Sequence, residues 1–241
     1  MTAAKIRLFV DHPLGVGQSV PLTGPQAHYL FGVMRQGAGS RLLVFNGREG
    51  EWLAEVTETG KRTGSLTCLE QSGPQLMPPD LWLLFAPVKK ARTDFIVEKA
   101  TELGVARIVP VHTDFTNSER VRQDRLQAHA LEAAEQCGAT FVPEVRGLIS
   151  LPRLLADWDG DRRILWADES LAGAAAALAN ARPGAWAILI GPEGGFSEPE
   201  KARLRSLPHV VSVSLGPRIL RADTAAAAAI TLWQAALGDW R

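Results

Sequence analysis

Two segments near the C-terminus decide the fold: Ile190-Gly191-Pro192-Glu193-Gly194-Gly195-Phe196-Ser197 and Ser214-Leu215-Gly216-Pro217-Arg218-Ile219-Leu220-Arg221-Ala222-Asp223-Thr224. Each segment follows an apolar run that is typical of a buried strand, and each leads into a predicted helix. Loops that leave neighbouring strands of an open α/β sheet can together enclose one small molecule. The glycines and charged side chains of the two segments therefore predict a ligand site.

Each segment also has a purely structural interpretation. Glycine serves tight turns in many proteins, so the loop from Gly191 to Gly195, taken alone, fits a simple strand-to-helix connection equally well. Arg218 and Arg221 could each be buried in an ion pair with a carboxylate or stay exposed. Two arginines directly after a strand nevertheless favour a functional role over this structural one. The first loop contains neither a Gly-Lys-Ser/Thr sequence nor Gly-x-Gly-x-x-Gly, so it lacks the usual nucleotide-binding fingerprints.

Composition predicts a cytoplasmic globular protein. The chain has 241 residues, 46% of them hydrophobic, and a formal net charge of zero. Its two cysteines, Cys68 and Cys137, fit neither a metal site nor a disulfide framework, which suits a reducing compartment. The apolar stretch from Ile6 to Val10 is too short for a signal peptide. Ala225 to Leu237 falls short of the roughly 18 apolar residues that a membrane span needs.

A proline-rich stretch divides the chain. Three prolines and a glycine lie between residues 73 and 80, which predicts a linker between a domain at 1–72 and a domain at 81–241. The first domain shows one helix, from Pro25 to about Met34, and an Asn46-Gly47 hairpin signal. Five short strands are predicted there: Arg7 to Val10, Ser19 to Leu22, Arg41 to Phe45, Glu51 to Val56 and Ser65 to Leu69. We expect a small β domain.

In the second domain strands and helices alternate. The predicted strands are 81–86, 107–111, 163–167, 185–190 and 210–215. The predicted helices are 94–103 with Thr93 as cap, 121–137, 171–181, one that begins at a capping box at 197–200, and 224–237. This alternation predicts an α/β fold with a mostly parallel sheet covered on both faces.

Taken together, the two glycine-bearing segments resemble the cofactor-binding end of the SPOUT class of S-adenosylmethionine-dependent RNA methyltransferases. Within that class they resemble the RsmE family, which methylates N3 of a uridine in 16S rRNA. The resemblance extends over the whole chain through residues 7–9, 28–35 and 45–47, which resemble a PUA-like RNA-binding domain, and 98–105, 135–138 and 142–144 in the catalytic part. It implies a PUA-like β-barrel, a deep C-terminal trefoil knot and a homodimer. One departure is Asp223, where the family usually has glutamate.

The resemblance implies roles for individual residues. Cofactor contacts fall on Ala167, Ile190, Gly191, Glu193, Gly194, Leu215, Gly216, Ile219, Leu220 and Thr224. Arg221 and Arg218 are the candidates to hold the uracil oxygens or a phosphate. Glu193 and Asp223 are the two candidate general bases, between which the sequence does not decide. Candidate RNA contacts are Arg7, Arg35, Lys89, Lys90, Arg92 and Arg218. No metal-ligand pattern is present among the histidines and cysteines.

The expected partner is 16S rRNA, within the 30S subunit. Two other functions remain open at this level. One is a methyltransferase that acts on another RNA, such as tRNA. The other is a non-catalytic RNA-binding factor for ribosome assembly, against which the intact glycines and Arg221 argue.

Overall fold

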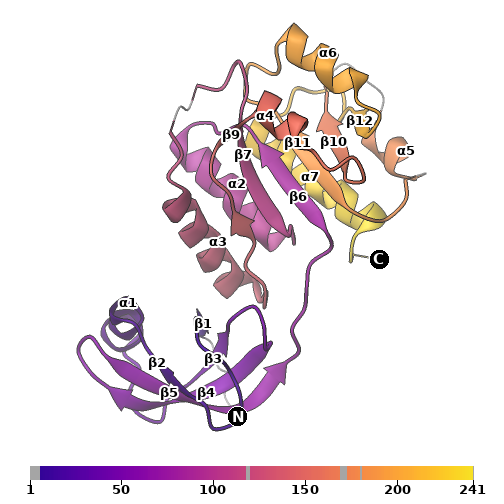
Figure 1. Ribbon diagram of the computed structural model, residues 1–241. Helices are drawn as coiled ribbons and strands as arrows, with labels where there is room; N and C mark the ends of the chain where they lie inside the picture. The colour runs from indigo at the N-terminus through magenta and orange to yellow at the C-terminus, as the bar shows by residue number, and fades with distance from the viewer. Residues whose placement is uncertain (1–5, 118–119, 169–172, 180, 241) are drawn as a thin grey trace. The chain divides into compact units, whose positions relative to one another are not determined.

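The computed structural model describes residues 6–117, 120–168, 173–179 and 181–240. The chain forms two compact units (Figure 1). One contains Met1–Met77 and Ala134–Val142, and the other contains Pro78–Ala133 and Pro143–Arg241. In the described part of the chain, no helix combines the length and apolar character needed to cross a membrane.

The first unit is built on a five-stranded sheet. Its strands are β1 (Arg7–Phe9), β2 (Ser19–Pro21), β3 (Arg41–Phe45), β4 (Glu51–Thr59) and β5 (Gly64–Gly73), in agreement with the five predicted. Their order is β1-β3-β4-β5-β2, with β1 parallel to β3 and the other pairs antiparallel. Among the described residues β1 and β2 do not pair with each other. The barrel that the resemblance implies is therefore an open sheet here.

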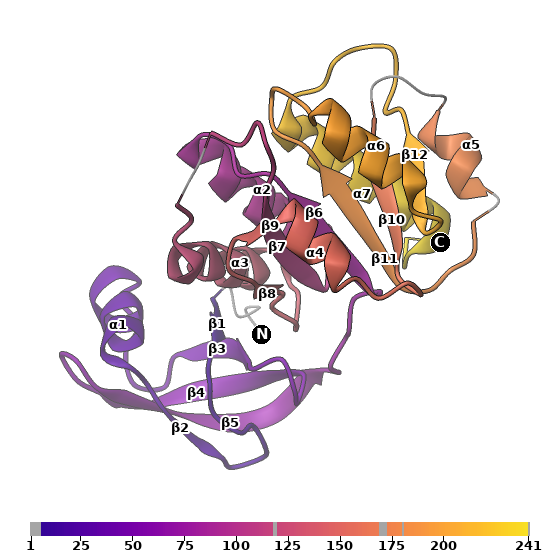
Figure 2. The same ribbon diagram turned by 45° about the horizontal axis from the view of Figure 1, so that its top comes forward.

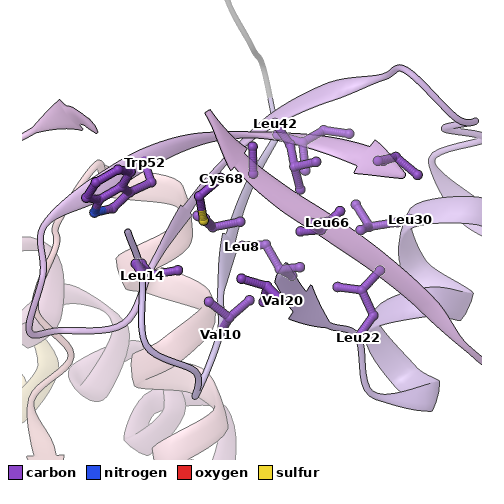
Figure 3. Packing of buried hydrophobic residues seen from close by; sticks show 14 of the residues in the cluster. Leu8, Val10, Leu14, Val20, Leu22, Leu30, Leu42, Trp52, Leu66 and Cys68 are labelled. Atoms are coloured by element: carbon purple, nitrogen blue, oxygen red, sulfur yellow. The ribbon is translucent and has the colours of Figure 1, made fainter. Parts of the chain in front are cut away.

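One face of this sheet carries the core of the first unit. Along β4, Trp52, Ala54 and Val56 are buried while the residues between them are partly exposed. This alternation follows from the two-residue repeat of a strand. Figure 3 shows the buried side chains gathered together, with Leu30 reaching them from outside the sheet and Leu66 from β5.

The predicted helix of the first unit is present, but it is not α-helical throughout. A short helix, α1 (Gly24–Ala27), continues into a π-helical segment, η1 (His28–Val33). Arg35 follows with a φ of +54°, a left-handed conformation that commonly ends a helix. The spacing of hydrophobic residues predicts a helix here, but it does not distinguish a π-helical segment from an α-helix.

The second unit is built on a parallel sheet. Its strands are β6 (Leu81–Phe85), β7 (Arg107–His112), β8 (Glu144–Val145), β9 (Ile149–Ser150), β10 (Arg163–Ala167), β11 (Trp186–Ile190) and β12 (Val210–Val213). The order is β12-β10-β11-β6-β7-β8, with β9 paired to β7, and every pair is parallel. The predicted α/β class and parallel sheet are confirmed; the two-residue strands β8 and β9 were not predicted.

Helices cover both faces of this sheet. They are α2 (Lys90–Glu102), α3 (Gln123–Cys137), α4 (Leu151–Ala156), α5 (Ala174–Ala179), α6 (Glu198–Ser206) and α7 (Ala222–Leu237). α4 and α6 pack on one face through Leu151, Leu155 and Leu204. α7 lies on the opposite side of β11 from α6 and also contacts α2 and α5 (Figure 2). All five residues of β11 are consequently buried.

Two helices begin before their predicted starts, and one further helix is present. α2 begins at Lys90, and Thr93, predicted as its cap, lies inside the first turn with its hydroxyl bonded to the backbone N–H and carbonyl of Val88. α7 begins at Ala222, so Arg221 is its N-cap and Asp223 lies in its first turn. α4 was not predicted. The capping box of Ser197 and Glu200 at the start of α6 is confirmed. Residues 171, 172 and 180 of the helix predicted at 171–181 lie outside the described residues.

Candidate functional site

The two segments singled out in the sequence meet in one cavity. The strands β10, β11 and β12 are parallel and adjacent, so the loops that follow them leave the same edge of the sheet. Between these loops lies a cavity of about 680 Å³, a size typical of small-molecule sites. It is lined by Trp166, Ala167, Asp168, 190–196, Lys201, Arg205, Ser214, Leu215, Gly216, 218–222 and Ala225.

Most of the predicted cofactor-contact residues line this cavity. Thr224 does not: it lies exposed in the first turn of α7, outside the lining. Ile219 lines the cavity although 81% of it is exposed. Arg218 and Arg221 also line it from exposed positions. The structure thus brings all of these residues except Thr224 together around one cavity.

Two glycines shape the cavity wall. A Cβ on Gly191 would lie 2.7 Å from Cε2 of Phe196, closer than real side chains approach, so the backbone occupies space that no other residue fits. Gly216 has a φ of +120°, which side chains rarely tolerate. The backbone conformation of the turn is enough to explain a glycine at position 216. At position 191 a glycine is required because the Phe196 ring packs closely against the backbone.

An aromatic pair forms one wall. Trp166 and Phe196 meet edge to face, with ring centroids 5.7 Å apart at 87°. Trp166 is only 1% exposed, and its indole N–H has no hydrogen-bond partner among the described residues. The pair thus gives the cavity an apolar wall, behind which the indole N–H is itself buried.

Arg205 and Lys201, from α6, add charge that the sequence did not predict. Arg205 donates to the buried carboxylate of Asp168 at 3.1 Å and lies 5.7 Å from the centroid of the Trp166 ring. Lys201 pairs with Glu198 at 2.8 Å, a hydrogen bond that lowers the pKa of the Glu198 carboxyl. Nothing in the sequence near Asp168 indicates a partner 37 residues away.

The two candidate bases share one guanidinium. Nη1 of Arg92 lies 3.4 Å from Oε1 of Glu193, and Nε of Arg92 lies 3.9 Å from Oδ2 of Asp223. The other oxygen of Asp223 accepts a hydrogen bond from the backbone N–H of Thr224 at 3.0 Å. Arg92 belongs to α2, so three separate segments meet here. Arg92, a predicted RNA contact, pairs with two carboxylates in the structure.

The predicted RNA contacts fall in different places. Lys89, Lys90 and Arg92 line a second cavity of about 530 Å³, which also includes Glu193. Arg35 is exposed in the first unit, directly after η1. These positions are compatible with contacts to RNA.

Arg7 is used inside the first unit. Its guanidinium bonds the Glu51 carboxylate at 2.7 Å and the backbone carbonyls of Ala134, Glu135 and Ala139 at 2.7 to 3.0 Å. It also lies 4.6 Å from the centroid of the Phe45 ring, and the side chain is 12% exposed. These contacts occupy four of its five N–H donors, so the structure assigns Arg7 to packing and leaves it out of the RNA contacts proposed below.

Comparisons with known proteins agree with this geometry. A protein-family model described as an RNA methyltransferase domain matches residues 75–234. A second family model, described as an RNA methyltransferase PUA domain, matches residues 22–67. Ribosomal RNA small subunit methyltransferase E of Rickettsia conorii is 30% identical over 231 residues, 93% of each chain. The Bacillus subtilis protein of that name is 30% identical over 219 residues, 85% of each chain.

The chain belongs to the ribosomal RNA small subunit methyltransferase E family. This confirms the resemblance found in the sequence, including its PUA-like domain. A solved structure of the Neisseria gonorrhoeae member, bound to S-adenosyl methionine, is similar with a TM-score of 0.88 at 27% identity, covering 98% of this chain and 99% of that one. Family membership also identifies this chain as an RNA methyltransferase.

Proposed function

We propose that this protein is an S-adenosylmethionine-dependent methyltransferase that methylates N3 of a specific uridine in 16S rRNA. The observation that carries the proposal is the cavity at the carboxyl ends of β10, β11 and β12, joined to the Glu193–Arg92–Asp223 cluster. The names of the relatives support small-subunit rRNA as substrate. The ligand of the Neisseria gonorrhoeae structure supports the cofactor.

The residues of the cavity fit this cofactor. Without a side chain at Gly191, the backbone can approach a ligand closely. Leu215, Ile219 and Leu220 line the cavity, and we expect them to supply apolar contacts for an adenine ring. The carboxylate of Asp168 supplies a polar group in the same wall. When bound, S-adenosylmethionine supplies a methyl group on a cationic sulfur.

The remaining chemistry concerns the uracil. Its N3 carries a proton in the neutral base, so a general base must remove that proton and the resulting anion needs stabilisation. Glu193 and Asp223 are the two candidate bases, and Arg92 lies between them and holds their carboxylates in place. Arg221, exposed at the cavity and the N-cap of α7, is free to hold a uracil oxygen.

The finer features implied by the resemblance belong to the same proposal. We expect a deep trefoil knot in the second unit, a homodimer, and action on the 30S subunit in the cytoplasm. The buried face of α7 packs within its own unit, through residues that include Ala229 and Trp233. A partner would therefore meet other surfaces of α7, on which Leu232 is 37% exposed. Static light scattering on the purified protein tests the dimer.

Methyl transfer tests the proposed function directly. Purified protein is incubated with S-adenosylmethionine and 30S subunits that lack their native methyl groups, and the nucleosides of the digested RNA are identified by mass spectrometry. We expect N3-methyluridine. Arg221→Ala should lower the rate by roughly 100-fold or more, as for loss of one donor to a developing anion. Arg203→Ala is the control, because Arg203 is exposed on α6 and is not among the cavity residues.

The same assay distinguishes the alternatives. A methylated nucleoside other than N3-methyluridine would overturn the assignment of the reacting atom. Cofactor binding without product on 30S subunits would indicate another RNA, such as tRNA. Neither product nor cofactor binding would favour a non-catalytic RNA-binding factor. Between the two carboxylates, the variant of Glu193→Gln and Asp223→Asn that loses the single-turnover rate while keeping cofactor affinity identifies the base.

A further inference from the structure

Several hydrogen bonds fix the short loop at residues 113–116, which follows β7. The backbone N–H of Thr113 donates to Oγ1 of Thr116 at 2.9 Å, and the N–H of Thr116 donates to the carbonyl of Thr113 at 3.0 Å. The backbone N–H of Asp114 donates to Oε1 of Glu200 at 3.0 Å. The Asp114 carboxylate accepts a hydrogen bond from the Ser197 hydroxyl. These bonds tie the loop to the start of α6, beside the cofactor cavity.

This loop presents an aromatic ring to solvent. Phe115 lies between the two buried threonines and is 47% exposed. A single exposed hydrophobic residue is ordinary, but Phe115 is placed next to the reaction site. A Cβ built on Gly194, which lines the cofactor cavity, would lie 3.2 Å from Cβ of Phe115. Phe115 thus packs with its base against the cofactor loop and leaves its ring accessible.

Cationic groups line a cavity that the same loop reaches through Asn117. Asn117, two residues further along, lines the second cavity together with Lys89, Lys90 and Arg92. Glu193 lines both this cavity and the cofactor cavity. The second cavity therefore adjoins the site of methyl transfer, and its lysines supply positive charge where a polyanion would have to pass.

We propose that Phe115 and the second cavity form a binding subsite for a single-stranded nucleotide of the substrate RNA next to the methylated base. The base stacks on the Phe115 ring, its phosphate meets Lys89 and Lys90, and the Asn117 amide faces the base edge. Only an unpaired base exposes a face for stacking, so the subsite selects single-stranded RNA. The proposal rests on the function proposed above and adds the substrate side of that site.

The rigidity of the loop strengthens this assignment. Stacking on an aromatic side chain contributes most when the ring is already fixed before the ligand arrives, because less conformational freedom is lost on binding. The hydrogen bonds of Thr113, Asp114 and Thr116 provide that fixation without burying Phe115.

The test compares Phe115→Leu with Phe95→Leu. Phe95, on α2, is 42% exposed and lines neither cavity, so it is a matched control. Two quantities are measured: KM for unmethylated 30S subunits, and affinity for fluorescein-labelled oligouridine, single-stranded or annealed to oligoadenosine. S-adenosylmethionine affinity and thermal unfolding of each variant show whether the fold and cofactor cavity are intact.

We expect Phe115→Leu to raise KM and weaken binding of the single strand about tenfold, with duplex binding and cofactor affinity unchanged. Phe115→Tyr should restore both values. Lys89→Ala and Lys90→Ala should each reduce the salt dependence of single-strand binding, the log–log slope by about 0.7. Loss in either measurement that tyrosine restores supports the subsite.

The proposal is overturned if Phe115→Leu behaves like Phe95→Leu in both measurements, or if leucine and tyrosine variants are equally impaired. Failure of the proposed function has a different signature. In that case the unaltered protein transfers no methyl group to 30S subunits, and the subsite is judged on oligouridine affinity alone.

Discussion

The sheets of the two units use their side chains in opposite ways. In β4 of the first unit buried and partly exposed residues alternate, whereas β11 of the second unit is buried over its whole length. A strand covered on both faces can place polar groups only beyond its ends. The charged groups of the cavity therefore lie beyond the strand ends, as Glu193 and Arg218 do, whereas Arg7 of the first unit lies on strand β1.

The sharpest test of this comparison is one large-to-small change in each sheet. Ile188 in β11 is 0% exposed, and Leu53 in β4 is only partly buried. We expect Ile188→Ala to lower the free energy of unfolding by about 2–5 kcal/mol, because it leaves a cavity. Leu53→Ala should cost about 1 kcal/mol or less. Urea unfolding measures both; equal costs would contradict the difference in burial between the sheets.

Arg7 and Arg221 extend the comparison to arginines of the two units. Arg7→Ala removes four hydrogen bonds, and we expect a loss of about 1.5–3 kcal/mol of stability because partly buried carbonyls lose a charged donor. Arg221→Ala should leave thermal unfolding unchanged, since Arg221 is exposed. Differential scanning calorimetry of both variants measures these two effects. An unaltered melting temperature for Arg7→Ala would return Arg7 to the candidate RNA contacts.

Gly191→Ala tests whether the cavity wall depends on the absence of a side chain. The added Cβ would meet the Phe196 ring at 2.7 Å, so ring or loop must move. We expect cofactor affinity to fall by roughly fivefold to 100-fold, which corresponds to overpacking of about 1–3 kcal/mol. Gly160→Ala is the control, because a Cβ there meets nothing within 4 Å. Isothermal titration with S-adenosylmethionine gives both values, and a match between them would refute the packing argument.

The smallest effect concerns the two cysteines, one in a buried core and one exposed. Burial raises the pKa of the Cys68 thiol, so Cys68 stays protonated to higher pH and supplies less reactive thiolate. Cys137 is exposed. We expect iodoacetamide at mildly alkaline pH to label Cys137 in the folded protein and both residues after unfolding, as read by peptide mass spectrometry. Rapid labelling of Cys68 in the native state would contradict this expectation and show that the hydrophobic core of the first unit opens.

Much of the fold followed from local patterns. Short strands bounded by turn residues located all five strands of the first sheet, and apolar runs located the long strands of the second. Elements held mainly by tertiary contacts were not predicted, as β8 and β9 illustrate with two residues each. Thr93 looked like a helix cap, yet α2 starts before it because Thr93 bonds back to Val88.

For the site, the sequence by itself determined the two glycine-bearing loops and the family, because the spacing of glycine, arginine and carboxylate residues is written along the chain. Only the tertiary structure decided which distant side chains meet these loops. Arg92 joins Glu193 and Asp223, Arg205 reaches Asp168, and Phe115 packs against Gly194. Such pairs join segments far apart in sequence, and no local periodicity encodes them. They are set by the parallel order of the strands, which brings separate loops to one edge of the sheet.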